Sequence, residues 1–145
     1  MINLDLSALV DRPIKDVFTF LADPNNMSKW NSAVVSLQQI TPGAVGVGTK
    51  FKSVGEMMGR RIEGEMQIIA YEPETKCGFQ VNAGPMQVNI TITLKTVGTG
   101  TKISLNAQGN PAGLFKLAEG VLAGRVKTMM EENLARLKSH LEKGA

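Results

Sequence analysis

The chain has 145 residues, of which 43% are hydrophobic and 20% are charged, and its formal net charge is +3 at pH 7. This composition excludes a disordered chain, because it supplies enough apolar side chain to build a core. The length favours one domain over residues 1–145. The basic residues are dispersed, with Arg60-Arg61 as the longest basic run, so we expect no nucleic-acid partner.

A single cysteine, Cys77, and a single histidine, His140, limit the chemistry that this chain can carry. One cysteine excludes an internal disulfide and a multi-thiolate zinc site, and one histidine excludes most histidine-ligated metals. We therefore expect no metal site and no cofactor. No segment approaches the roughly 18 apolar residues of a spanning helix, and no secretory signal is visible, so we expect no stable membrane insertion and a cytoplasmic location.

The chain is expected to begin with a strand and two short helices. Alternation of apolar and polar residues predicts a strand over Ile2–Val10. We expect Asp11 to cap a helix over Pro13–Leu21, which has a proline in its first turn and apolar residues at helical spacing. After a break at Asp23-Pro24, Met27–Trp30 is predicted to form one more helical turn.

Alternation of apolar and polar residues predicts six further strands, separated by short turns. Their ranges are Ser32–Ile40, Lys50–Met58, Arg60–Tyr71, Lys76–Ala83, Met86–Lys95 and Thr101–Gln108. The third of these six shows one predicted inward face, formed by Ile62, Gly64, Met66, Ile68 and Ala70. Short turns between consecutive strands favour an antiparallel meander.

A long helix is predicted at the C-terminal end. From about Ala112 to Glu142 the sequence contains no proline, and apolar residues recur every three or four positions. These apolar residues form two stripes, and Gly120 and Gly124 lie where the stripes meet. Because glycine disfavours a helix, we expect these glycines either to mark a bend or to leave room for a ligand.

These elements predict an α+β fold in which a curved seven-stranded antiparallel sheet wraps around a long C-terminal helix, with two short helices after the first strand. Seven strands make a sheet roughly 30 Å wide, and one helix about 10 Å across cannot cover its apolar face. An apolar cavity between sheet and helix is therefore expected, and such a cavity suits a small hydrophobic molecule. The alternative is that the protein's own side chains fill this space.

Several short motifs resemble one known family. They are Asp23-Pro24 with Met27 and Trp30, Thr41-Pro42-Gly43 to Gly48, Tyr71-Glu72-Pro73 and the long C-terminal helix. Together they are similar to the polyketide cyclase/dehydrase-like branch of the START/birch-pollen-allergen superfamily (SRPBCC), over essentially the whole chain. The resemblance implies a helix-grip fold with a deep cavity for lipids, sterols, polyketides, quinones or other hydrophobic molecules. Members of the superfamily range from carriers and sensors to aromatases and cyclases.

Three functions are compatible with these predictions. The first is binding or transport of a small hydrophobic ligand, such as a lipid, a polyketide-like aromatic or an isoprenoid. The second is a polyketide cyclase or dehydratase that uses the same cavity, and the third is a structural or interaction protein whose own side chains fill the cavity. The predicted inward row has no histidine and no carboxylate, which general acid–base catalysis usually needs, so we favour binding. The oligomeric state stays open, a homodimer included.

The candidate ligand-binding residues are the apolar positions predicted to face inward. They are Trp30, Phe51, Met57, Met66, Ile68, Phe79, Val81, Met86, Val88, Ile90 and Leu105 before and on the strands, and Leu117, Val121 and Met129 on the helix. Several are methionines, whose flexible side chains suit a tolerant pocket. Ordinary core packing is the alternative role for each of them.

Three polar residues complete the candidate site, and each also has a purely structural interpretation. Asn133 lies on the apolar stripe of the helix and could orient a ligand carbonyl or hydroxyl, and Arg125 could pair with an anionic head group. Tyr71 could polarise a carbonyl in the enzymatic alternative. Cys77 is predicted to face inward and to be inert, and His140 to be solvated, so we assign no catalytic residue.

Overall fold

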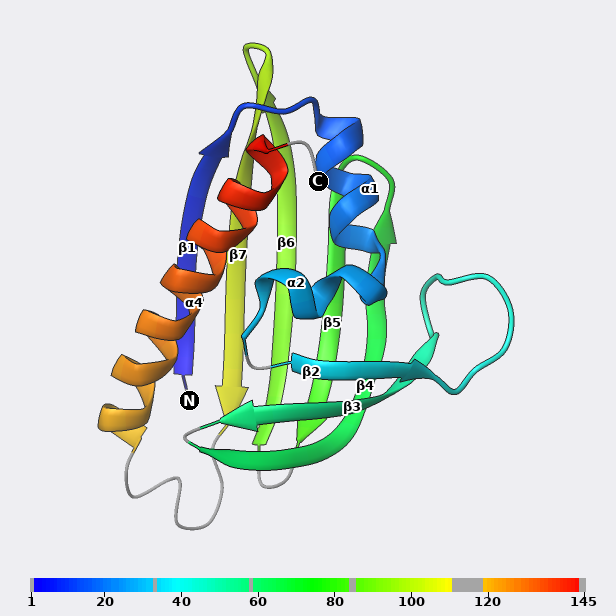
Figure 1. Ribbon diagram of the computed structural model, residues 1–145, viewed down its shortest axis with the longest axis vertical. Helices are drawn as coiled ribbons and strands as arrows, with labels where there is room; N and C mark the ends of the chain where they lie inside the picture. Colours follow the sequence, from blue (N-terminus) through cyan, green and yellow to red (C-terminus); the bar gives the residue numbers. More distant parts are fainter. Residues whose placement is uncertain (1, 33, 58, 84–85, 111–118, 144–145) are drawn as a thin grey trace.

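The computed structural model describes residues 2–32, 34–57, 59–83, 86–110 and 119–143, with backbone only for residues 2, 57, 83, 86, 110 and 119–123. The helices and strands follow one another along the chain largely in the order that the sequence predicts (Figure 1). Their bounds are β1 Ile2–Val10, α1 Ile14–Ala22, the 3₁₀ helix η1 Pro24–Asn26, α2 Met27–Trp30, β2 Val34–Gln39, β3 Lys50–Met57, β4 Arg60–Glu72, β5 Lys76–Ala83, β6 Met86–Val97, β7 Gly100–Asn110 and α4 Glu119–Glu142.

All seven strands belong to one antiparallel sheet in the order β1-β7-β6-β5-β4-β3-β2. The long strands run side by side, whereas β2 and β3 cross their lower ends (Figure 1). Helix α4 lies along β1 at one edge of the sheet, and α2 contacts α4. This arrangement confirms the predicted fold class, including the two short helices after the first strand. Among the described helices, none has the length and apolar content needed to cross a bilayer.

The start of α1 differs from the prediction. Pro13 occupies the N-cap position and no side chain caps the helix. The Asp11 backbone N–H instead donates to the carboxylate of Glu142 at 3.0 Å. The Arg12 guanidinium donates to the Leu141 carbonyl at 2.7 Å. Asp11 is therefore not the expected cap, because the β1–α1 corner is bonded to the C-terminal end of α4.

A β-bulge in β4 changes which residues face inward. Ile68 pairs with Phe79 and Ala70 pairs with Gly78, so Ile69 is one extra residue on this strand. The predicted alternation is therefore wrong beyond Ile68. Ala70 leaves the inward face, and Tyr71 pairs with the buried Cys77 instead.

The core lies between the sheet and the helices. Its large and almost fully buried side chains include Trp30, Phe79, Met66, Ile68, Ile92, Ile103, Leu105, Leu137 and Leu141. On α4, the predicted second stripe of Val126, Met129, Met130, Leu137 and Leu141 faces this core. The first stripe, on residues 114–122, lies outside the described side chains.

We predict opposite effects for alanine at two glycines. A Cβ on Gly100 would lie 2.5 Å from the Val10 carbonyl oxygen, so Gly100→Ala must push β1 and β7 apart. We expect it to lower the free energy of unfolding by about 1–3 kcal/mol. Gly124 is exposed and a Cβ there meets no described atom within 4 Å. Gly124→Ala should therefore raise the stability by up to about 1 kcal/mol through helix propensity.

Urea unfolding of both variants beside the unmodified protein checks this pair. Equal stability of Gly100→Ala and the unmodified protein would contradict the close approach of the two strands.

Candidate ligand-binding site

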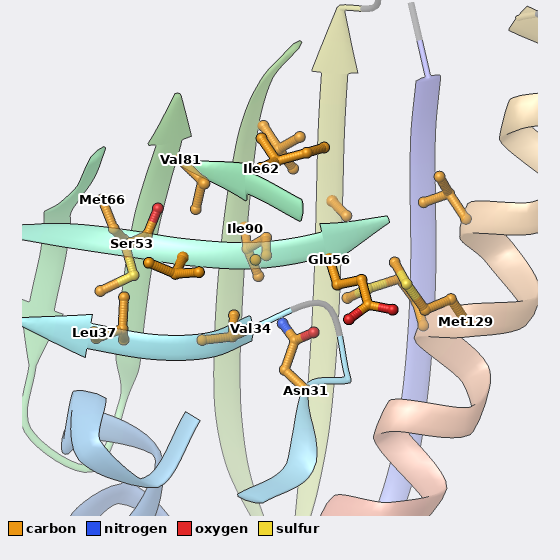
Figure 2. A pocket seen from close by; sticks show the side chains of 16 residues that line it. Asn31, Val34, Leu37, Ser53, Glu56, Ile62, Met66, Val81, Ile90 and Met129 are labelled. Atoms are coloured by element: carbon orange, nitrogen blue, oxygen red, sulfur yellow. The ribbon is translucent and has the colours of Figure 1, made fainter. Parts of the chain in front are cut away.

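A cavity of about 120 Å³ lies between the sheet and α4, as the sequence predicts (Figure 2). Its described lining residues are Asn31, Val34, Leu37, Ser53, Val54, Gly55, Glu56, Ile62, Met66, Val81, Val88, Ile90, Ala107, Val126, Met129 and Met130. They come from β2 to β7, from α4 and from the residue after α2. Its volume is close to that of apolar cavities of about 150 Å³ that admit benzene.

The described lining is apolar except at three positions. Figure 2 shows Met66, Val81 and Ile90 around the space, with Met129 reaching it from α4. Asn31, Ser53 and Glu56 supply the polar groups among the described lining residues. A cavity of this character fits an apolar molecule and leaves few groups to set its orientation.

The sequence predicts Phe51 and Met57 of β3 at the cavity, but it does not predict the contribution of β2 or of Ser53. A register shift between Val34 and Ser36 lets Val34 and Leu37, three positions apart, both line the cavity. Strict alternation cannot place two such residues on one side of a strand. Ser53 follows Phe51 by two positions and both are buried, so alternation could have found Ser53 if polar residues had been considered.

The apolar residues predicted from the sequence divide into three groups. Met66, Val81, Val88, Ile90 and Met129 line the described cavity. The buried residues that pack around it, outside the described lining, are Trp30, Phe51, Ile68, Phe79 and Leu105. Leu117 and the side chains of Met57, Met86 and Val121 lie outside the described part of the chain. Contact of any of these residues with a ligand stays a prediction.

Two of the polar candidates lie away from the described lining. Tyr71 is at the opposite end of β4 from the cavity residue Ile62. Its ring packs edge-on against Phe18 of α1, with centroids 5.5 Å apart and planes at 76°. Arg125 is exposed, because it precedes Val126 by one position and so points about 100° away from the side of α4 that lines the cavity.

Asn133 is fully buried, and its amide is engaged within the protein. Its Oδ1 accepts hydrogen bonds from the Ser32 backbone N–H at 3.1 Å and from the Arg136 guanidinium at 3.0 Å. Its NH₂ group donates to Asn31 Oδ1 at 3.0 Å and contacts the Met130 sulfur at 3.9 Å. Asn133 is therefore a positioning residue in this structure. It holds α4 against the segment after α2, and its partners Asn31 and Met130 line the cavity.

Arg136 strengthens the same connection, since it also donates to the Trp30 carbonyl at 2.9 Å. The bonds to Trp30, Asn31 and Ser32 join residues about a hundred positions apart in the sequence, so no local motif predicts them.

The two reactive side chains singled out from the sequence do not contribute to the described lining. The Cys77 thiol is buried, and desolvation raises its pKa from 9.0 to about 12, so it stays protonated at neutral pH. The His140 ring packs on Phe20 with centroids 4.9 Å apart, so it is less solvated than predicted. Within the described residues, no three His, Cys, Asp or Glu side chains gather as metal ligands.

We predict that Asn133→Ala destabilises the protein by about 1–3 kcal/mol, because it removes the buried hydrogen bonds that Asn133 makes with the Ser32 N–H and with Asn31 Oδ1. Urea unfolding measures the change. Ser139→Ala, an exposed position on the same helix, serves as the control and should leave the stability within about 0.5 kcal/mol. An Asn133→Ala variant as stable as this control would contradict the positioning role.

A second prediction concerns alkaline pH. The folded-state pKa of Cys77 lies above its ordinary value of 9.0, so the unfolded chain releases this proton first. The group's contribution to stability is therefore complete below pH 9.0 and declines as the pH rises towards about 12. Between about pH 7.5 and pH 10.5, we expect the unmodified protein to lose about 2 kcal/mol relative to Cys77→Ala.

Urea unfolding of both proteins at the two pH values checks this prediction. A stability difference that does not change with pH would show that the thiol is not desolvated as described.

Comparisons with known proteins place the chain in a family. The model of the family described as polyketide cyclase / dehydrase and lipid transport matches residues 1–142. A conserved protein from Geobacillus kaustophilus has a similar structure, with a TM-score of 0.77, 18% identity and coverage of 97% of this chain and 95% of that one. A protein from Thermus thermophilus gives a TM-score of 0.74, 20% identity and coverage of 97% and 94%.

A third similar structure is that of Ara h 8.0201, with a TM-score of 0.66, 15% identity and coverage of 94% of this chain and 97% of that one. No curated protein sequence matches this chain. At these identities the structures show the fold alone, and they agree with the helix-grip fold that the sequence predicts. With the family model matched over residues 1–142, the chain belongs to the polyketide cyclase/dehydrase and lipid transport family.

Proposed function

We propose that this protein binds or transports a small hydrophobic molecule, such as a lipid, a polyketide-like aromatic or an isoprenoid, in the cavity between the sheet and α4. The observation that carries the proposal is the apolar cavity of about 120 Å³ itself, lined from β2 to β7 and from α4. The family description, which joins polyketide cyclases and dehydrases with lipid transport, supports the same class of ligand.

Burial of apolar surface supplies the affinity in this proposal. Each Å² removed from water contributes about 25 cal/mol, so a ligand that buries roughly 200 Å² gains about 5 kcal/mol before ordering costs. Met66, Met129 and Met130 line the cavity, and their flexible thioethers can adapt to ligands of different shape. A tolerant apolar site of this kind fits a carrier better than a site that must hold one reacting geometry.

The enzymatic alternative, a polyketide cyclase or dehydratase, needs a group at the cavity that donates or accepts a proton. Tyr71, proposed for that role from the sequence, lies at the other end of β4, and the Cys77 thiol is protonated. Glu56 does line the cavity, so the expectation that no carboxylate faces it is wrong, and Glu56 is the acid–base group that the described lining offers to this alternative. Because the residues expected to polarise a substrate lie elsewhere, we favour binding.

We predict that Ile90→Trp weakens the binding of naphthalene at least tenfold, because the larger side chain occupies the cavity that Ile90 lines. Titration followed by amide NMR shifts measures the affinity and also locates the site. Val35→Trp, at a 54% exposed position on the edge strand β2, is the matched control and should bind as the unmodified protein does.

If Ile90→Trp does not fold, Val81→Phe fills the same space with a smaller change. Absence of naphthalene binding to the unmodified protein, or equal binding by folded cavity-filling variants, would refute the proposed function.

A further inference from the structure

One hydroxyl inside the cavity has no role in holding the fold together. Ser53 lies in the middle of β3, opposite Leu37 of β2 and Gly64 of β4. It is only 7% exposed and it lines the cavity. Its hydroxyl makes no hydrogen bond to any residue that the structure describes. Figure 2 shows Ser53 among the apolar side chains of Met66, Val81 and Leu37.

A hydroxyl that faces an apolar cavity and has no partner within the fold leaves its hydrogen-bonding capacity to whatever occupies the cavity. A ligand oxygen inside the cavity would satisfy the hydroxyl. Since a serine hydroxyl both donates and accepts, that oxygen can belong to a carbonyl or to an alcohol.

A carboxylate at the end of β3 limits the charge of the ligand. Glu56 lines the cavity three positions after Ser53, and Figure 2 shows its carboxylate next to Met129 of α4 and Asn31. Glu56 makes no ion pair with a described residue. Its partner across the β3–β4 ladder, Arg61, pairs instead with Glu63 at 3.6 Å. Glu56 is exposed at the end of β3, so solvent screens its negative charge and it disfavours a carboxylate or phosphate on the ligand by a modest factor.

We propose that the cavity selects a neutral molecule with an apolar body and a carbonyl or hydroxyl oxygen that hydrogen-bonds to Ser53, and that Glu56 discriminates against anionic ligands. This inference rests on the proposed function, since it requires a ligand in the cavity. It deepens that function by naming a specificity-determining residue, Ser53, and by excluding free fatty acids as the preferred ligands.

The test compares three molecules of one shape: naphthalene, 2-acetylnaphthalene and 2-naphthoate. We expect the unmodified protein to bind the ketone about fivefold more tightly than the hydrocarbon, the effect of one neutral hydrogen bond. Ser53→Ala should lose this fivefold preference and keep its affinity for naphthalene. Ser36→Ala, an exposed serine on the neighbouring strand β2, is the matched control and should keep the preference.

Thermal unfolding separates a ligand contact from a structural role. Because the Ser53 hydroxyl has no described partner, Ser53→Ala should unfold at the same or a higher temperature than the unmodified protein. Glu56→Gln should bind 2-naphthoate about two- to fivefold more tightly, the range of one partly exposed charge interaction, with no change for naphthalene.

Three outcomes would overturn the inference: equal affinity for ketone and hydrocarbon in the unmodified protein, an unchanged preference in Ser53→Ala, or tighter binding of 2-naphthoate than of the ketone. All three leave the proposed function standing, provided that naphthalene binds in the cavity. Failure of every one of the three molecules to bind overturns the proposed function, and this inference with it.

Discussion

The position of α4 is the constraint on which the rest of the structure depends. The helix lies along β1 at one edge of the sheet, while β2 and β3 cross the lower ends of the long strands. The cavity lies between them and is lined by side chains of both. The buried amide of Asn133, bonded to Ser32, Asn31 and Arg136, holds the helix at this distance from the sheet.

The polar groups of the protein are divided between holding the fold and lining the cavity. Asn133 bonds to Asn31 and Ser32 directly after α2, Arg136 donates to the carbonyl of Trp30 at the end of α2, and Arg12 donates to the C-terminal end of α4. The second half of α4, from Asn133 to Leu141, is therefore fixed by side chain–backbone contacts. Ser53 is different, because it lies on the cavity wall without a described partner, and this difference separates a candidate recognition group from the structural ones.

Regular alternation and helical spacing were enough to predict the fold. Antiparallel strands with one wet face and an amphipathic helix have periods of apolar residues that the sequence displays directly, so the element order and the antiparallel meander from β2 to β7 follow from it. The pairing of β1 with β7 does not follow from these periods. The same periods give correct inward positions at Met66, Val81 and Ile90, because the strands are regular there. The need for a cavity also follows from the sequence, since one helix is narrower than the sheet it covers.

Only the tertiary structure decided where the alternation of inward and outward residues is interrupted, and which residues distant in the sequence come into contact. The bulges at Ile69 in β4 and between Val34 and Ser36 in β2 shift the inward face by one residue, and a shift of this kind depends on the paired strand. The bonds of Asn133 join segments about a hundred positions apart, so the residue expected to hold a ligand holds the helix instead. The sequence determined the elements and the apolar lining, whereas long-range pairing decided the role of each polar group.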